Sequence, residues 1–205
     1  MKIYRTQFAL TLIVAGWMLT LAADLHAANR ARADPAAARE YFTDIPLTDQ
    51  DGQPRRLYSD LLRDRVVVIS AMFTDCQGVC PVTMGNLAKL QRWLGPRLGK
   101  DVYLLSLTVD RENDSPARLK AYAERFNARP GWYFLTGPPE NLDAVLRKLG
   151  LHTRARESHS PIFLVGNVAT GLWKKTPGMA PAAGLIDVVD SVLADRMETE
   201  GAASR

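Results

Sequence analysis

The sequence predicts an α/β domain of three layers over residues 41–197, with a partly parallel sheet between helices. Two runs of apolar and β-branched residues, 66–73 (VVVISAMF) and 102–109 (VYLLSLTV), are typical of strands buried on both faces of a sheet. A segment with helical spacing of apolar residues follows each run, and this alternation favours parallel strands joined by helices. With 205 residues, 47% of them hydrophobic, the chain is long enough for one core and one domain.

A β-hairpin is predicted to begin the domain, because an Asp-Gly turn signal at residues 51–52 separates two short strand-like segments, 42–47 and 56–58. Prolines at the first helical position, Pro81 and Pro116, support two of the predicted helix starts. The other elements follow in this order: a strand at 66–73, a helix at 81–98 that Gly95 and Pro96 end or kink, a strand at 102–109, a helix from a cap at 114–115 to about 126, a strand at 132–135, a helix at 139–149, a strand at 162–165, a turn at 166–171, a strand at 172–174 and a helix from 181 to about 197.

The N-terminus predicts export. Lys2 and Arg5 precede an uncharged apolar run at residues 8–23, which Asp24 ends. A positive start, an apolar run and small residues at the exit are typical of a signal peptide, and the length of the run approaches that of a bilayer span. Residues 1–27 are therefore predicted to be either a cleaved signal peptide or a retained membrane anchor. The positive-inside rule places the rest of the chain outside the cytoplasm, in the periplasm or on the periplasmic face of the inner membrane.

Both ends of the predicted domain carry segments without hydrophobic patterning. Residues 28–40 (ANRARADPAAARE) are predicted to be a flexible linker, with a helical extension of the domain as the alternative. Residues 198–205 are predicted to be a disordered tail. The net charge is +4 and the pI about 9.2, without a run of five or six basic residues, which argues against nucleic-acid binding.

The two cysteines, Cys76 and Cys80, lie in the segment TDCQGVCP at the predicted turn from a buried strand into a helix. Functional sites of open α/β sheets lie at the carboxyl ends of strands, and helix N-termini stabilise thiolates. Residues four apart on a helix face the same way, so the two sulfurs converge. A purely structural disulfide is disfavoured, because closing a five-residue loop contributes only about 2 kcal/mol. A redox dithiol and a metal site both remain open.

The three histidines differ in their suitability as metal ligands. His26 lies at the exit of the N-terminal segment, and His152 is expected to be a solvated loop residue. His159 precedes the predicted strand at 162–165, and in a parallel sheet this loop is expected to lie near the cysteines. Three methionines, Met72, Met84 and Met179, offer further soft donors. Core packing explains Met84 better than a role as a ligand.

Five segments occur in a fixed order along the chain: 66–81, 106–116 (SLTVDRENDSP), 119–123 (LKAYA), 134–137 (FLTG) and His159 with the serine that follows it. This ordered set resembles the SCO/SenC family of copper-binding proteins, over residues 42–193. The resemblance implies a thioredoxin-like three-layer domain with a central mixed sheet.

In that family a C-x-x-x-C pair and a distant histidine bind copper. The resemblance therefore implies Cys76, Cys80 and His159 as the ligands of one copper ion per chain, as Cu(I) or Cu(II). Two thiolates and an imidazole suit three-coordinate Cu(I), whereas Cu(II) prefers a further oxygen or nitrogen ligand. The same donors also suit Zn(II), so the residue types alone leave the metal open.

The resemblance implies an exported metallochaperone that receives copper from an upstream donor. Its acceptor would be the CuA site of cytochrome c oxidase subunit II, or another copper-acceptor protein. The alternative is a thiol–disulfide oxidoreductase that acts on the acceptor's cysteines, with Cys76 and Cys80 as its redox pair. The sequence therefore does not decide whether the chain is an enzyme. A third hypothesis is a redox or copper sensor with no delivery role.

The sequence departs from the family pattern at several positions. Gln77 and Gly78 stand where family members commonly have Pro and Asp, which loosens the loop and removes a carboxylate beside the cysteines. Arg111 stands where the family often has Pro. Asp75 is expected to cap the following helix. Pro161, just before a strand, resembles the cis-proline of thioredoxin-type oxidoreductases and supports the alternative function, although those enzymes usually carry C-x-x-C.

Overall fold

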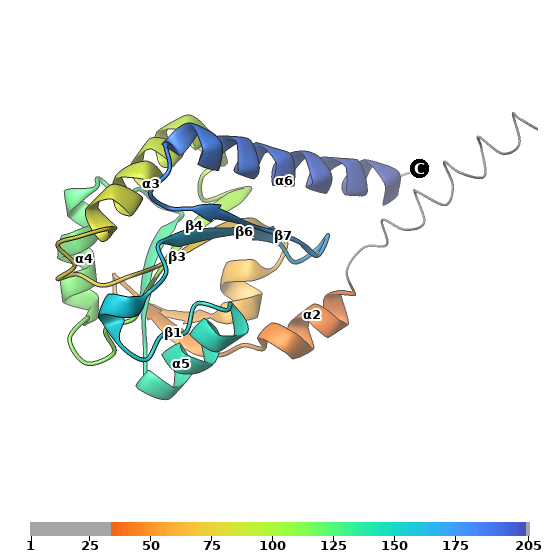
Figure 1. Ribbon diagram of the computed structural model, residues 1–205. Helices are drawn as coiled ribbons and strands as arrows, with labels where there is room; N and C mark the ends of the chain where they lie inside the picture. The colour runs from red at the N-terminus through yellow and green to blue at the C-terminus, as the bar shows by residue number, and fades with distance from the viewer. Residues whose placement is uncertain (1–33, 204–205) are drawn as a thin grey trace, which may run out of the picture. The chain divides into compact units, whose positions relative to one another are not determined.

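A seven-stranded mixed sheet forms the middle layer of the domain in the computed structural model, which describes residues 34–203 (Figure 1). The strands, in chain order, are β1 (Pro46–Asp49), β2 (Pro54–Arg56), β3 (Val66–Met72), β4 (Val102–Thr108), β5 (Trp132–Thr136), β6 (Ile162–Asn167) and β7 (Leu172–Pro177). Across the sheet they lie in the order β2-β1-β5-β4-β3-β6-β7, so that β3 and β4 are interior strands.

Helices cover both faces of this sheet, which confirms the predicted three-layer α/β architecture. They are α2 (Pro35–Phe42), η1 (Leu57–Leu62), α3 (Cys80–Leu94), η2 (Gly95–Arg97), α4 (Pro116–Arg125), α5 (Pro139–Lys148), η3 (Arg156–Ser158) and α6 (Ala182–Ala203). Figure 1 shows α3, α4 and α6 on one side of the sheet and α2 and α5 on the other.

The directions of the three strands around β3 determine which loops meet. β3 runs parallel to β4, with Met72 opposite Thr108, and antiparallel to β6, with Ser70 opposite Phe163. The expectation that a parallel sheet brings the His159 loop to the cysteines is therefore wrong. A parallel β6 would begin at the opposite edge, whereas the antiparallel β6 begins at the edge where β3 ends.

The interior strands carry the core. Every residue of β3 and β4 is buried, as their unbroken apolar runs predicted. Met84 of α3 is fully buried, which confirms its interpretation as a core residue. Polar groups of β3, β4 and β5 pair with one another in this interior, since the indole Nε1 of Trp132 donates to Ser106 Oγ at 3.0 Å, and Ser106 Oγ lies 3.3 Å from Ser70 Oγ.

The linker expected at 28–40 is wrong for its last six residues, which belong to α2. Asp34 caps this helix by accepting from the backbone N–H of Ala36 at 2.8 Å, and Pro35 occupies its first turn. The alanines that follow have high helix propensity. At the end of the helix the buried ring of Phe42, expected to start a strand, lies 5.7 Å from the ring of Trp173.

Two further boundaries differ from the prediction. The hairpin forms, with β1 antiparallel to β2, but residues 57–58 begin the helical segment η1 instead of extending the second strand. The apolar side chains of η1 are buried under the sheet, which favours a helical turn over a strand edge. The C-terminal helix α6 continues to Ala203, so the tail expected at 198–205 is helical over most of its length.

The predicted signal peptide or membrane anchor, residues 1–27, lies outside the described residues. Within residues 34–203 no helix combines the length and the apolar character that crossing a bilayer requires.

Candidate metal centre

The two cysteines lie where β3 leads into α3, as predicted. Cys80 is the first residue of α3 and is fully buried, and Cys76 is nine-tenths buried on the loop before it. Both are free thiols. The backbone N–H of Cys80 donates to Cys76 Sγ at 3.4 Å, so the N-terminus of α3 faces that sulfur.

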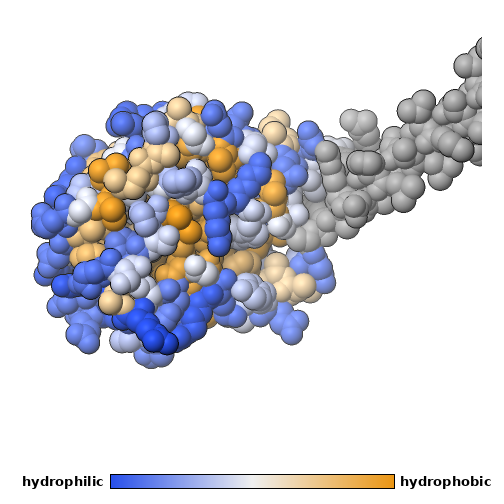
Figure 2. Space-filling view, in the orientation of Figure 1, coloured by the Kyte–Doolittle hydropathy of each residue, from blue (hydrophilic) through white to orange (hydrophobic). Residues whose placement is uncertain are grey.

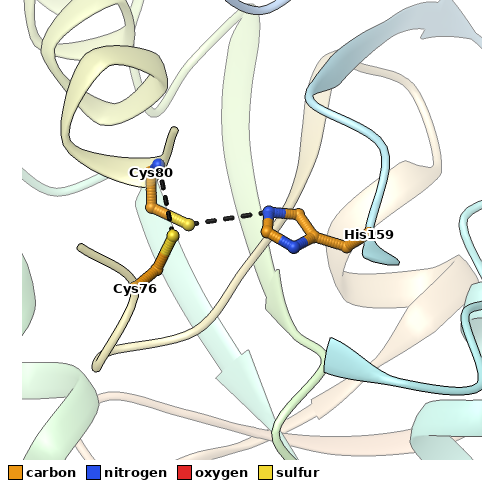
Figure 3. Close-up of side chains that lie close together, drawn as sticks. All are labelled: Cys76, Cys80 and His159. Atoms are coloured by element: carbon orange, nitrogen blue, oxygen red, sulfur yellow. Dashed lines mark hydrogen bonds between the residues drawn. The ribbon is translucent and has the colours of Figure 1, made fainter. Parts of the chain in front are cut away.

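His159 meets this pair from a segment 79 residues further along the chain. It follows η3 directly, and only 8% of its surface is exposed. Its Nε2 lies 3.6 Å from Cys80 Sγ (Figure 3). The ligand atoms of Cys76, Cys80 and His159 all lie within 4.8 Å of one another, which is close enough for a single ion to contact all three.

The backbone fixes which nitrogen of the imidazole faces the sulfurs. His159 Nδ1 lies 2.7 Å from the carbonyl oxygen of Arg156, and because a carbonyl only accepts, Nδ1 carries the proton. The lone pair of the neutral ring is then on Nε2, toward Cys80. Metal-ligating histidines typically have their other nitrogen held in this way.

Arg156 also ties the histidine segment to the rest of the domain. Its guanidinium pairs with the carboxylate of Asp110, just after β4, and lies 5.2 Å from the centre of the Phe73 ring. The Phe73 ring in turn packs edge-on against His159, with centroids 5.5 Å apart. Burial acts to raise the pKa of Asp110, but hydrogen bonds from Asn113 and Arg156 lower it overall, so Asp110 is an anion available to Arg156.

A second buried carboxylate supports the cysteine loop. Asp114 accepts from the backbone N–H of Thr74 at 3.1 Å and from its hydroxyl at 2.5 Å. It also accepts from the hydroxyl of Thr108 at 2.5 Å. Asp114 therefore connects the end of β4 to the residue two positions before Cys76, and fixes the path of the loop between β3 and α3.

The Cys80 thiol is held protonated in the metal-free protein. Burial, followed by its hydrogen bond with Cys76, raises the pKa of Cys80 to about 12. A metal ion must therefore displace this proton when it binds. The donor set suits a soft ion, because thiolate sulfur and imidazole nitrogen are preferred by Cu(I) and also accepted by Zn(II).

Other residues singled out from the sequence lie elsewhere or act otherwise. His152 lies 3.8 Å from Asp143 Oδ1, on the surface, which agrees with its interpretation as a loop residue outside the site. The prediction that Asp75 caps α3 is wrong, because its carboxylate is exposed and pairs with Arg118 at 3.0 Å. Among the described residues every peptide bond is trans, so Pro161 does not form the cis-proline arrangement.

Sequence reasoning missed the residues that orient the ligands. Arg156 carried no pattern that linked it to Asp110, which is 46 positions away. The sequence pattern predicts Asp114 as part of a helix cap, but Ser115 is the capping residue and Asp114 faces the cysteine loop. A charged residue directly after a buried strand was the one available signal for Asp110.

A separate apolar groove of about 430 Å³ lies between α2, α5 and the strands β6 and β7. Figure 2 shows hydrophobic residues on this face, between α6 above and α2 and α5 below. Among the described residues that line the groove there is no cysteine or histidine, so the groove is distinct from the candidate metal centre. Its wall includes Tyr41, Phe42, Lys148, Leu164, Trp173 and Lys175.

The fold and this centre define a thioredoxin-like α/β domain that joins a cysteine pair at a helix N-terminus to a distant histidine. The SCO1/SenC family model matches residues 33–189. The chain therefore belongs to the SCO1/SenC family, as its motifs indicated.

Individual relatives agree with this assignment. A protein from Stutzerimonas stutzeri, provisionally named a copper-binding protein, is 31% identical over 107 residues, which are 52% of this chain and 50% of that protein. The chain thus spans about half the length of the curated relatives it matches. The crystal structure of a SCO1/SenC family lipoprotein from Bacillus anthracis str. Ames has 30% identity and a TM-score of 0.62, and the match covers 72% of this chain and 92% of that one.

A second solved structure is that of BsSco, described as a member of the Sco family of cytochrome c oxidase assembly proteins with a disulfide switch. It has 27% identity and a TM-score of 0.59, and the match covers 72% of this chain and 90% of BsSco.

Proposed function

We propose that this chain is an exported copper metallochaperone. It binds one copper ion through Cys76, Cys80 and His159 and delivers this cargo to the CuA site of cytochrome c oxidase subunit II, or to another copper-acceptor protein. The observation that carries the proposal is the convergence of the three ligand atoms within 4.8 Å of one another. The name of the Stutzerimonas stutzeri relative and the description of BsSco support copper as the cargo and oxidase assembly as its use.

The composition of the centre suits a carrier. Three protein donors satisfy Cu(I), but they leave room for a ligand from a partner to approach the ion. An upstream donor and a downstream acceptor then exchange copper by stepwise replacement of ligands. The predicted export segment at residues 1–27 places this exchange in the periplasm or at the periplasmic face of the inner membrane. The relative from Bacillus anthracis, a lipoprotein, supports a membrane-associated location.

Copper binding by the full chain tests the ligand set. The reduced protein in detergent micelles is titrated anaerobically with Cu(I) in competition with a chelator, and about one equivalent should bind. His159→Ala should weaken the affinity by about tenfold or more, the size of effect seen when a supporting group of a metal site is removed. His152→Ala is the matched control from the same loop, and its affinity should equal that of the parent. Equal affinities in the His159 variant and the parent would exclude the histidine as a ligand.

Delivery is tested separately. A strain that lacks the gene should lose oxidase activity, and added copper should restore it at least in part. A strain whose oxidase activity is normal without the gene would favour a sensor over a carrier.

A second candidate function is thiol–disulfide exchange with the acceptor's cysteines. The adjacent free thiols of Cys76 and Cys80 favour it, and so does the disulfide switch described for BsSco. In this case the reduced protein should reduce a disulfide of the acceptor at the same rate with and without His159. A rate that depends on bound copper and on His159 would instead support the carrier.

A further inference from the structure

The turn after β7, residues 178–180, is held by hydrogen bonds to Pro161 and to Asn86 of α3. The backbone N–H of Gly178 donates to the carbonyl oxygen of Pro161 at 2.7 Å. The side chain of Asn86, buried on α3, donates to the carbonyl oxygens of both Gly178 and Ala180, at 2.9 and 2.8 Å. The two residues that flank Met179 are thus fixed by one side chain, which leaves the position of Met179 little freedom.

This turn lies beside both halves of the candidate copper site. A Cβ atom on Gly178 would lie 2.8 Å from the Pro161 carbonyl oxygen and 2.8 Å from the Thr83 Cγ2, so the turn lies against both α3 and the residue before β6. Pro161 is two residues after His159, and the Thr83 hydroxyl donates to the carbonyl of Cys80 at 3.0 Å. Met179 therefore follows a glycine that contacts both the segment of His159 and the first turn of the helix that begins with Cys80.

Met179 is exposed, unlike the three candidate ligands. About 48% of its surface is accessible, whereas Cys80 and His159 are buried. Val82, two residues after Cys80 on α3, is also exposed. An exposed thioether is consequently carried on a turn that contacts the chain segments of two buried candidate ligands, Cys80 and His159.

We propose that Met179 is a transit ligand, which contacts Cu(I) as the ion enters or leaves the site formed by Cys76, Cys80 and His159. This inference rests on the proposed function. Thioether sulfur is a soft donor that selects Cu(I), and it binds more weakly than thiolate. The exposed methionine accepts the ion first, and the buried thiolates then draw it inward.

The exchange is balanced without any redox partner. Copper remains Cu(I) throughout, and the neutral thioether neither gains nor loses a proton. As the Cu–S bond to Met179 breaks, bonds to the two cysteine sulfurs form, and the thiol protons that these lose pass to solvent.

Kinetics of copper capture test the proposal. The full chain in detergent micelles takes Cu(I) from its coloured bicinchoninate complex in a stopped-flow instrument, and loss of colour gives the rate. Met179→Leu keeps the apolar bulk but removes the sulfur, and its capture rate should fall by about tenfold. Its equilibrium affinity should match that of the parent, because a transit ligand is not bound in the final complex.

Met197→Leu is the matched control, since Met197 is 71% exposed and lies far along α6. Its capture rate should equal that of the parent. A Met179→Leu rate equal to the parent's would overturn the proposal, and so would an affinity loss as large as the rate loss, which would make Met179 a resident ligand. Failure of the parent chain to bind Cu(I) at all would instead refute the proposed function, so the two failures are distinguishable.

Discussion

His159 donates its Nδ1 proton to the backbone carbonyl of Arg156 across 2.7 Å, in a turn that η3 closes. This one contact sets the tautomer of the ring and directs Nε2 to the Cys80 sulfur, 3.6 Å away. The geometry of the centre therefore depends on where Arg156 is held, and Arg156 is held by Asp110 and Phe73.

Removal of the Arg156 side chain should weaken copper binding without removing a ligand. In Arg156→Ala the segment before His159 loses its ion pair with Asp110, and the Cu(I) affinity should fall by about tenfold. Competition titration measures the change. Arg154→Ala, in the same exposed loop, is the control and should leave the affinity unchanged.

A double variant separates positioning from general damage. Because Arg156 acts through His159, adding Arg156→Ala to His159→Ala should weaken binding no further. If the two losses multiply instead, Arg156 supports some other part of the protein and its assigned role is wrong.

Copper affinity should rise with pH. The pKa of the Cys80 thiol is raised to about 12, so this thiol is protonated in the metal-free protein at every pH between 6 and 9. Binding must release at least that proton, and the apparent Cu(I) affinity should therefore increase by about tenfold or more per pH unit. Chelator competition at several pH values measures the slope, and an affinity that is constant from pH 6 to 9 would contradict a thiolate ligand at Cys80.

Asp114 should stabilise both the fold and the cysteine loop. Asp114→Asn keeps the size of the side chain but replaces one of its acceptor oxygens with an amide. It thereby weakens the bonds from Thr74 and Thr108 in a buried position, and should cost about 1–3 kcal/mol of unfolding free energy. Urea unfolding measures this loss. Glu112→Gln, an exposed neighbour, should unfold like the parent, and equal stability of the two variants would show that the Asp114 network is unimportant.

Gly178→Ala should disturb the turn that packs against Pro161 and Thr83. The added methyl group would lie 2.8 Å from the Pro161 carbonyl oxygen and from Thr83 Cγ2, so one of these groups must move. Over-packing of this kind typically costs about 1–3 kcal/mol. Thermal or urea unfolding gives the stability, and the capture assay described for Met179 should show slower uptake. Gly184→Ala has open space around the new methyl group and is the control, so a loss of stability equal in both variants would argue against the contact.

The elements that the sequence predicted well were those with an unbroken pattern. The apolar runs that became β3 and β4 are buried along their whole length, and the prolines marked the starts of α3 and α4 correctly. The N-terminal boundary was predicted less well, because alanine-rich composition fits both a mobile linker and a helix. The helix is stabilised by the Asp34 cap and by the burial of Phe42. The burial of Phe42 depends on tertiary packing, which the local composition does not predict.

The sequence indicates the three candidate ligands, and the structure brings them together. The path by which they meet was not predictable from local pattern. It depends on β6 running antiparallel to β3. The residues of a short apolar strand do not indicate its direction relative to its neighbours. The groups that hold the ligands, Arg156 and Asp114, act across 46 and 40 positions respectively, and such pairings become visible only when the chain is folded.

X-ray absorption at the copper edge of the Cu(I)-loaded full chain tests the central claim most directly. The account predicts scattering from two sulfur atoms and one imidazole in the parent, and loss of the imidazole contribution in His159→Ala but not in His152→Ala. A copper environment with no imidazole, or one that is the same in the parent and the His159 variant, would contradict it.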